Sequence, residues 1–556
     1  MKRTKVVAIC VAVVSICVPS AQADGASGRS VAALLPFEAH ADDGVVLRGH
    51  VYLPDGEGPF GTVLEYSPYW NTNGGYGQSD GMIVEQDGRE TLGLWLGRYL
   101  EVGFAVALVN IRGSGESDGC FQFGLPRDWS DVYTVVETLA DQPWSNGKIG
   151  MIGLSYPGWT QYMALASKPP SLKAVIPVSG VIDPWNLWGR HGASARTDLT
   201  YSPVQHTVFA GTSTTGVLAM TGPFVPDTHV SHVTCPDYVE DSFHNAVFGV
   251  RGDRTQYWRT QDLRPHIAGT TVPTLFANGL GRDGHILQFD DLWGLLEGPK
   301  RMLIGQWGHE NPDEAGYAVF EEMTVAWMDR YLRDGPEVVE PGVVDYQDDT
   351  GVWNTADQWP PSGTRVSLYL SDGSLVASRD EVDQSSVTFT SVMQDPQPDN
   401  CPGMTSVYVS PPLAHDVLLA GNYEADITVS STMPDGNLGI LLYHREEIRD
   451  CVTEALPNWF TEPGGRIGQA LTDLRHARGN EGGSPFPIGE PTAVHAMSHP
   501  FASRVRAGER LVLSIGGGAN ELQPDSTTSI LTVTTGPGHV GEVSITVIEG
   551  ELAFVG

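Results

Sequence analysis

Three residues, Ser155, Asp283 and His309, have the types and the chain order that nucleophilic catalysis requires. A serine hydroxyl becomes a strong nucleophile when a neighbouring imidazole takes its proton, and a carboxylate holds that imidazole in the productive tautomer. Each of the three residues follows a short apolar run, and glycines lie close to each of them. These residues therefore predict a hydrolytic triad, provided that strands and loops bring them together.

The choice of Ser155 as nucleophile depends on its flanking elements. Ser117 matches the string Gly-x-Ser-x-Gly to the letter, but the sequence after it does not open a helix. Ser213 has no clear buried strand before it. Ser155 follows a strand predicted at 148–152 and precedes a helix predicted at 159–167, which is the strand, sharp turn and helix of a nucleophile elbow. Its second glycine comes one position later than in the strict pattern.

The acid and the base follow two further predicted strands. Asp283 comes after the apolar run 272–277, and His309 comes after 301–304. Hydrolases of the α/β type have the chain order nucleophile, acid, histidine, and that order holds here. The alternatives that remain open are His285 as the base and Asp290 or Asp291 as the acid.

Apolar runs typical of buried strands alternate with helical periodicity through the first part of the chain. Apolar residues spaced i, i+3, i+4 and i+7 from Val132 to Leu139 share one face of a helix. The predicted strands of this part are 45–47, 50–53, 61–66, 104–110, 148–152, 172–178, 272–277 and 301–304. This succession indicates an α/β sheet.

The periodicity changes twice along the chain. Between 181 and 268 the alternation lapses into aromatic and glycine-rich sequence, which we interpret as an inserted helical cap. From 341 onward, alternating β-branched residues and frequent turns replace helical periodicity and indicate a β-sandwich. The predicted divisions are a signal peptide at 1–23, α/β parts at 24–180 and 269–340, the cap at 181–268, and a β-domain at 341–556.

Composition and the first residues limit the partners and the location of the protein. The chain has 556 residues, 67 acidic against 33 basic, and its net charge of −34 repels the phosphates of nucleic acid. A basic start, an apolar stretch at 6–18 and the sequence Ala21-Gln-Ala23 match a secretory signal peptide. Because this stretch is shorter than the roughly 20 residues of a membrane span, we expect an exported, soluble protein without a stable membrane anchor.

Cysteine usage agrees with an exported protein. Removal of the signal peptide leaves Cys120, Cys235, Cys401 and Cys451. An even number favours two disulfides, with three possible connectivities. We favour Cys401 with Cys451, which share one C-terminal segment, and by elimination Cys120 with Cys235, while free thiols are the alternative. The absence of a Cys-x-x-Cys pair argues against zinc.

Several strings of this sequence resemble the cocaine esterase and X-prolyl dipeptidyl-peptidase family of serine hydrolases. The matching strings are Ser67-Pro-Tyr69, Ile111-Arg-Gly-Ser-Gly-Glu-Ser117, 144–158, 257–265 and Gly305-Gln-Trp-Gly-His309. The similarity covers nearly the whole chain after the signal peptide. It implies an α/β-hydrolase fold with an inserted helical cap, followed by a C-terminal all-β jelly roll, and it makes Ser117 part of a structural loop.

The resemblance also implies a role for each site residue. Ser155 would be the nucleophile, Asp283 the acid and His309 the base. The family completes its oxyanion hole with a tyrosine hydroxyl and the amide after the nucleophile, which correspond here to Tyr69 and Tyr156. No metal or organic cofactor is implied. We expect activity to fall as His309 is protonated, near the ordinary histidine pKa of about 6.5.

The substrate class remains open between two forms of the same chemistry. We expect a carboxylesterase-like hydrolase of small esters or amides, and the alternative is an X-prolyl dipeptidyl-peptidase of short peptides. Pro157 stands where amino-ester hydrolases of the group have Glu, and Arg282 stands where an aromatic residue is common. A dipeptidyl-peptidase needs a carboxylate for the substrate amine, and the candidates in the cap are Asp198, Asp227, Asp237, Glu240 and Asp241.

A non-catalytic extracellular binding protein on a hydrolase scaffold is the alternative from another class. The complete set of triad residues argues against it. A dinucleotide site after the strand at 104–110 is excluded, because Gly113 and Gly115 lack the third glycine of that motif and position 118 is Asp.

Overall fold

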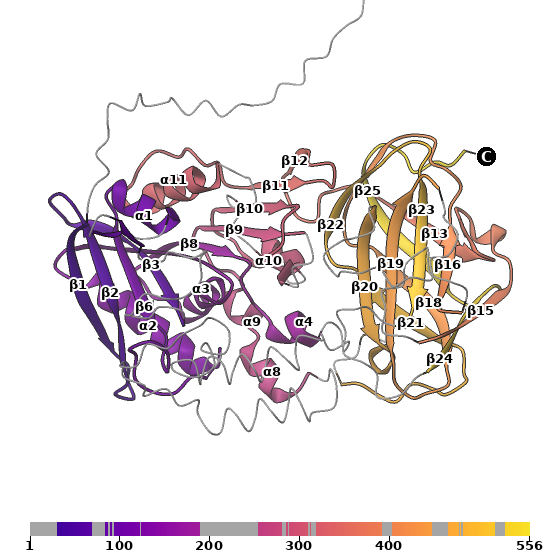
Figure 1. The fold of residues 1–556 in the computed structure, drawn as a ribbon, viewed down its shortest axis with the longest axis horizontal. Coiled ribbons are helices and arrows are strands. Elements are labelled where there is room, and N and C mark those ends of the chain that lie inside the picture. Colours follow the sequence, from indigo (N-terminus) through magenta and orange to yellow (C-terminus); the bar gives the residue numbers. More distant parts are fainter. Residues whose placement is uncertain are drawn as a thin grey trace, which may run out of the picture.

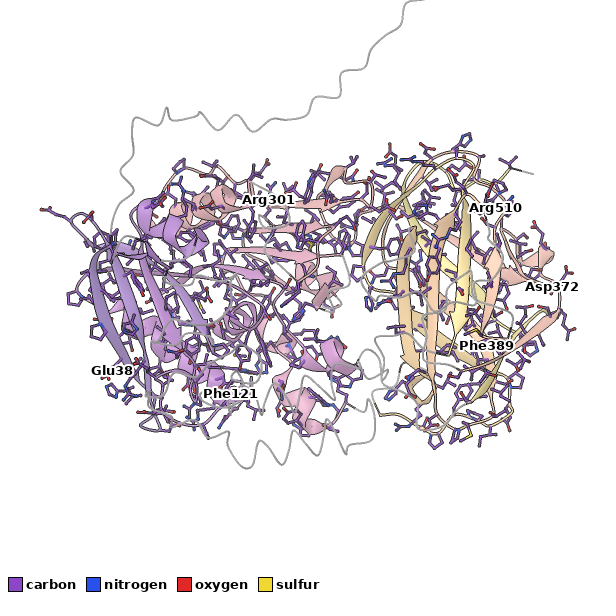
Figure 2. All side chains as sticks on the ribbon, in the orientation of Figure 1. Glu38, Phe121, Arg301, Asp372, Phe389 and Arg510 are labelled. Carbon is purple, nitrogen blue, oxygen red and sulfur yellow. The ribbon has the colours of Figure 1, made fainter. Side chains whose placement is uncertain are left out.

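The computed structural model describes residues 31–68, 84–86, 89–91, 94–122, 124–189, 254–280, 285–286, 289–309, 312, 319–391, 403–447, 465–477, 479, 482–517 and 529–555. They form an α/β domain and an all-β domain that lie side by side (Figure 1). Glu38 in the first domain and Asp372 in the second mark the two opposite ends of the molecule (Figure 2). The predicted signal peptide and most of the predicted cap lie outside the described residues.

One ten-stranded sheet forms the centre of the α/β domain. In sheet order its strands are β1 (Val31–His40), β2 (Val46–Pro54), β6 (Ala105–Asn110), β3 (Phe60–Ser67), β7 (Ser145–Leu154), β8 (Leu172–Val178), β9 (Thr274–Gly279), β10 (Lys300–Gly305), β11 (Val343–Gln347) and β12 (Trp353–Ala356). The strands from β6 to β11 are parallel, whereas β1, β2 and β12 join antiparallel at the edges. The predicted α/β class is confirmed.

Helices cover both faces of this sheet (Figure 1). Helices α2 (Pro126–Ala140) and α3 (Tyr156–Ser167) pack on one face, and α1 (Leu94–Glu101) and α11 (Phe320–Leu332) pack on the other. The six residues of β6 are all buried, and the five apolar ones alternate between the two cores, which explains the continuous apolar run in the sequence.

The remaining described elements of the domain are short. They are α4 (Pro184–Gly189), α8 (Gln256–Gln261), α9 (Arg264–Ile267), α10 (Phe289–Leu295) and the two-stranded ribbon of β4 (Val84–Gln86) and β5 (Arg89–Thr91). No helix among the described ranges is long and apolar enough to cross a membrane.

The first strand was missed, because the sequence predicted that strands begin near Val45. Strand β1 reads Val-Ala-Ala-Leu-Leu-Pro-Phe-Glu-Ala-His and pairs only with β2, at the edge of the sheet. Its side chains are buried only toward its end, so the apolar pattern is weak. Pro36 cannot donate a hydrogen bond and is tolerated in a strand at such an edge position.

The second domain is an all-β sandwich with its own apolar core. Its strands are β13 (Thr364–Ser371), β14 (Ser374–Val376), β15 (Ser385–Thr390), β16 (Thr405–Val409), β17 (Val417–Gly421), β18 (Glu424–Ser431), β19 (Asn437–Arg445), β20 (Arg466–Asp473), β21 (Thr492–Met497), β22 (Phe501–Val505), β23 (Arg510–Gly516), β24 (Ile530–Thr535) and β25 (Gly541–Glu549), with 3₁₀ turns at Arg379–Glu381 and Leu474–His476. We call residues 364–555 the β-domain.

The two domains do not separate at residue 340, where the sequence placed the boundary. Strand β11 pairs parallel with β10, and β12 pairs antiparallel with β11, so both belong to the first sheet. Both strands are short, and only the long-range pairing of β11 with β10, and of β12 with β11, assigns them to the α/β domain.

Cys120 is disulfide-bonded. The other cysteines lie outside the described residues, so the pairings of Cys120 with Cys235 and of Cys401 with Cys451 stay predictions.

A histidine of the β-domain lies between two carboxylates where the domains meet. His444 Nε2 is 3.2 Å from Asp349 Oδ2, in the turn between β11 and β12, and His444 Nδ1 is 3.1 Å from Glu509 Oε1. Burial of His444 opposes its protonation and is the largest contribution, but the hydrogen bonds and charges of Asp349 and Glu509 together outweigh it and raise the pKa of His444. We therefore expect this domain contact to depend on pH.

We expect His444→Gln to lower the thermal midpoint of unfolding, Tm, most strongly at mildly acidic pH. The pKa of folded His444 lies above the unfolded value of about 6.5, so the stabilisation is complete below that value and is lost as the pH rises through the folded-state pKa. Hydrogen bonds to charged groups contribute about 1.5–3 kcal/mol. Calorimetric scans from about pH 5.5 to about pH 9 measure the difference.

The matched control is His495→Gln. His495 forms an exposed pair with Asp426 at 3.0 Å, and such pairs contribute little. A difference between wild type and His444→Gln that grows as the pH rises would contradict the assigned direction of the pKa shift.

Candidate active site

Ser155 lies at a sharp turn between strand β7 and helix α3. Its backbone has φ 69° and ψ −118°, a left-handed conformation that a residue with a side chain rarely adopts. The Ser155 amide donates to the Val178 carbonyl oxygen on β8 at 2.9 Å, and the Ser155 carbonyl oxygen accepts the Trp159 amide at 2.9 Å. The turn thus has the conformation of a nucleophile elbow. Strain of this kind in the backbone is typical of functional sites.

Helix α3 begins at Tyr156, three positions earlier than the predicted start. Pro157 lies in the first turn of the helix, where a missing N–H costs nothing and the fixed φ of proline is suitable. The Tyr156 ring is buried against Phe121 and Trp159, at centroid distances of 6.0 and 5.3 Å. The Tyr156 amide is therefore at the N-terminus of α3, where the helix dipole favours negative charge.

Two glycines allow the helix to approach the sheet at this turn. A Cβ atom at Gly153 would lie 2.3 Å from the Pro157 Cβ, and a Cβ atom at Gly158 would lie 2.7 Å from the Val178 carbonyl oxygen. The second glycine comes one position late in the string because position 158 is where α3 meets β8. Side chains larger than hydrogen at these two positions would push the helix away from the strands.

The loops that carry the candidate residues leave the sheet at one edge. Leu154 on β7 pairs in register with Val178 on β8, and Val178 pairs in turn with Ala277 on β9. Gly279 on β9 pairs with Gly305 on β10. Because these strands are parallel and end level with one another, the loops after β7, β9 and β10 all begin at this edge.

His309 is in the loop after β10, and its ring stacks on that of His285. The two ring centroids are 4.4 Å apart, and the ring planes differ by 21°. The rival base of the sequence analysis therefore lies against the preferred one instead of at a separate place. Asp283, the preferred acid, and Tyr69, the predicted oxyanion donor, lie outside the described residues. Of the rival acids, Asp291 is exposed and paired with Arg264 at 3.1 Å.

The His309 loop turns closely over the end of β9. A Cβ atom at Gly279 would lie 2.1 Å from the Trp307 carbonyl oxygen, and a Cβ atom at Gly305 would lie 1.7 Å from the Trp307 ring. Trp307 itself is buried. Glycines at both strand ends are thus required for the path of this loop.

We expect Gly279→Ala to lower Tm and to displace the His309 loop, because the added methyl group collides with backbone that cannot move aside. Overpacking of this kind typically costs about 1–3 kcal/mol. The matched control is Gly294→Ala in helix α10, where an added Cβ has no atom within 4 Å. Alanine favours the helix there. Equal Tm values for the two variants would show that the loop does not need the glycine.

Ser117, which the literal motif search selects, has a structural position. It is fully buried, its hydroxyl donates to the Asn110 carbonyl oxygen at 2.8 Å, and it accepts the Arg48 amide at 2.8 Å. These bonds tie the loop after β6 to strand β2.

A buried ion cluster in the same region was not found from the sequence. Arg112 is 3% exposed and binds both carboxylate oxygens of Asp131, at 2.5 and 2.8 Å, and Asp43 at 2.9 Å. Asp128, one turn before Asp131 on α2, accepts the Gly124 amide at 2.7 Å. Burial, with the nearby charge of Asp131, raises the pKa of Asp128 to about 7. The cluster anchors α2 and the loop after β6 to each other.

A second cluster joins the two chain segments that flank the undescribed part of the predicted cap. The buried carboxylate of Asp183 is 2.6 Å from Arg264 and 3.1 Å from Arg254. Asp262 pairs with both of these arginines. Burial raises the pKa of Asp183 to about 6, against the lowering effect of the arginines. These ion pairs hold the start and the end of the predicted cap together.

Comparisons with known proteins agree with this architecture. Residues 43–311 match the model of the X-Pro dipeptidyl-peptidase (S15 family), and residues 337–540 match that of the X-Pro dipeptidyl-peptidase C-terminal non-catalytic domain. A cocaine esterase from Rhodococcus sp. is 24% identical over 397 residues, which is 60% of this chain and 62% of that protein. A putative Xaa-Pro dipeptidyl-peptidase from Streptomyces avermitilis is 24% identical over 421 residues, or 68% and 58% of the two chains. The chain thus spans about three fifths of the length of these curated relatives.

Solved structures show the same fold. An aminopeptidase from a marine sediment Thaumarchaeota archaeon has a TM-score of 0.72 at 16% identity, with coverage of 93% of this chain and 97% of that one. An α-amino acid ester hydrolase has a TM-score of 0.70 at 17% identity, with coverage of 95% and 99%. The fold is therefore that of the α/β-hydrolases, with a C-terminal β-sandwich. Within that class, the chain belongs to the cocaine esterase and X-Pro dipeptidyl-peptidase (S15) family of serine hydrolases.

Proposed function

We propose that the protein hydrolyses ester or amide bonds through Ser155, Asp283 and His309 and a covalent acyl-enzyme. The observation that carries the proposal is the strained backbone of Ser155 at the end of β7, with the loop of His309 beginning at the same sheet edge. Family membership supports the chemistry.

In the proposed reaction, His309 takes the proton of the Ser155 hydroxyl as the oxygen attacks the substrate carbonyl. Asp283 holds the imidazole in the tautomer that accepts this proton. The carbonyl oxygen becomes negative, and the Tyr156 amide and the Tyr69 hydroxyl stabilise it. The protonated His309 then gives its proton to the leaving group, and a water molecule activated by His309 hydrolyses the acyl-enzyme.

We favour small esters as substrates, with Xaa-Pro peptides as the second candidate. The cocaine esterase of Rhodococcus sp. and the putative Xaa-Pro dipeptidyl-peptidase of Streptomyces avermitilis are similar to this chain to the same degree, 24% identity. The candidate carboxylates for a substrate amine, Asp198, Asp227, Asp237, Glu240 and Asp241, lie outside the described residues. A non-catalytic binding role would not require the strained conformation of Ser155.

The experiment is a paired assay of the purified protein on a short-chain p-nitrophenyl ester and on Ala-Pro-p-nitroanilide. Turnover of the ester alone supports the esterase. Turnover of the anilide that disappears when the substrate amine is acetylated supports the dipeptidyl-peptidase. If neither substrate reacts and a fluorophosphonate probe does not label Ser155, the proposed function is wrong.

We also propose that the protein is exported after removal of residues 1–23. The basic and apolar start of the chain and the bonded state of Cys120 support this. N-terminal sequencing of the protein from the culture medium should begin at Asp24, and an intact Met1 on protein retained in the cell would contradict export.

A further inference from the structure

Gln306 precedes His309 in the loop after β10, and it contacts two other parts of the chain. Its amide donates to the side-chain oxygen of Gln347 at 3.0 Å, and its side chain donates to the Gln347 carbonyl oxygen at 2.9 Å. The same side chain is 3.3 Å from the carbonyl oxygen of Ala502, on strand β22. The start of the His309 loop is therefore bonded both to strand β11 and to the β-domain.

Gln347 is the last residue of β11, and the turn that follows it is held by its own hydrogen bonds. The Gln347 side chain donates to the Gly351 carbonyl oxygen at 3.1 Å. The fully buried carboxylate of Asp348 accepts the Thr350 hydroxyl at 2.6 Å and the Val352 amide at 3.1 Å. These bonds fix the turn between β11 and β12 and with it the position of Gln347.

The same turn is bound to the β-domain. Arg504 Nε on β22 donates to the Asp348 carboxylate at 3.1 Å, and the Ser503 hydroxyl donates to the Asp349 carboxylate at 2.5 Å. The Asp349 amide donates to the Ala502 carbonyl oxygen at 3.1 Å, so this oxygen faces donors from both Asp349 and Gln306. Strand β22 thus contacts the turn and the His309 loop at one point.

We propose that the β-domain positions His309 through Gln347 and Gln306, which are positioning residues for catalysis. This inference rests on the proposed function, in which His309 is the general base. A base works only at hydrogen-bond distance from the proton that it takes, and a misplacement of about 1 Å can cost about 100-fold in rate. The β-domain would then support the reaction without touching the substrate.

Trp307, the next residue, should keep the loop folded when the hydrogen bonds of Gln306 are removed. Its ring is buried and packs against Trp353 on β12, with the centroids 6.1 Å apart. Because Trp307 anchors the loop on the α/β domain, loss of the Gln306 bonds should shift the loop without unfolding it. Variants of these two glutamines are therefore suitable for kinetic tests.

The test compares four variants of the full-length protein by kcat and KM for p-nitrophenyl acetate and by the rate of fluorophosphonate labelling. Gln347→Met removes the oxygen that accepts the Gln306 amide, whereas Gln347→Glu keeps an oxygen there. Asp349→Asn weakens the hold of β22 on the turn. Gln358→Ala is the matched control, because Gln358 is exposed and its side chain donates to the Pro360 carbonyl oxygen at 3.4 Å, away from the His309 loop bonds described above.

We expect Gln347→Met to lower kcat and the labelling rate about tenfold with little change in KM, since substrate contacts are untouched. Gln347→Glu should restore most of the loss, Asp349→Asn should lower kcat in the same direction, and Gln358→Ala should match wild type. If Gln347→Met or Asp349→Asn retains wild-type kcat, the proposal is overturned.

His309→Ala separates this inference from the proposed function. If His309→Ala abolishes labelling while Gln347→Met and Asp349→Asn retain wild-type rates, the triad stands and the positioning role fails. If His309→Ala labels at the wild-type rate, His309 is not the base, and both the proposed function and this inference fail. If Gln347→Met strongly lowers Tm, Gln306→Ala is measured in its place, because it removes the two hydrogen bonds that the Gln306 side chain donates to the carbonyl oxygens of Gln347 and Ala502.

Discussion

Ser155→Ala should lower kcat for ester or amide hydrolysis by about 10⁴- to 10⁶-fold. Without the serine oxygen no acyl-enzyme forms, and only the slow attack by water remains. The variant should fold, because alanine differs from serine only by the missing hydroxyl group and so fills nearly the same space at the turn. Steady-state kinetics and fluorophosphonate labelling measure the effect, and labelling should be absent.

The matched control is Ser117→Ala, the serine of the literal motif. Its hydroxyl bonds to Asn110 and Arg48 are buried, so this variant should lose about 1–3 kcal/mol of stability and still be labelled. If Ser117→Ala loses labelling and Ser155→Ala keeps it, the nucleophile has been assigned wrongly.

Ser155→Gly provides a second readout of the same turn. Glycine adopts a positive φ at little cost, so it should raise Tm above that of Ser155→Ala while both remain inactive. A higher Tm for Ser155→Gly than for Ser155→Ala would show that the positive φ at this turn strains a residue that has a side chain.

Arg112→Met should reduce the free energy of unfolding by about 3–5 kcal/mol. The methionine fills most of the space but leaves the Asp131 carboxylate buried without its bidentate partner. A buried charge without compensation is among the most destabilising features that one substitution creates. Chemical denaturation followed by tryptophan fluorescence measures the loss.

Two further variants test the cause of that loss. Arg112→Met combined with Asp131→Leu removes the stranded charge and should recover part of the stability. Arg127→Met removes an exposed arginine paired with Asp42 at 2.5 Å, and it should change stability by less than about 1 kcal/mol. A loss for Arg127→Met as large as that for Arg112→Met would mean that burial is not the reason.

The strand, turn and helix around Ser155 were predictable because they depend on local sequence. Burial of β7 requires an apolar run before Ser155, and the close approach of α3 to the strands requires glycine at positions 153 and 158. Both requirements can be recognised from the residue types alone. The same holds for the strands before Asp283 and His309. Local pattern therefore predicts the strand, turn and helix around Ser155 and the strands that precede the other two candidate residues.

Contacts between distant segments could not be predicted. Nothing near Arg112 in the sequence indicates that Asp131 and Asp43 approach it, and nothing near Asp183 indicates Arg254. The assignment of β11 and β12 to the first sheet likewise depends on pairing with β10. A single sequence records what each residue prefers but not which segment lies opposite.

The order of strands in the first sheet has a consequence for how the chain matures. Strands β1 to β8 and the turn of Ser155 lie within residues 31–178. Strands β9 and β10 come only after residue 273, and β9 pairs with the free edge of β8. During synthesis Ser155 therefore emerges well before His309. Under the proposed function, a chain that ends before residue 309 would carry Ser155 without its base. If the proposed triad is correct, such a partial chain should be unable to form an acyl-enzyme.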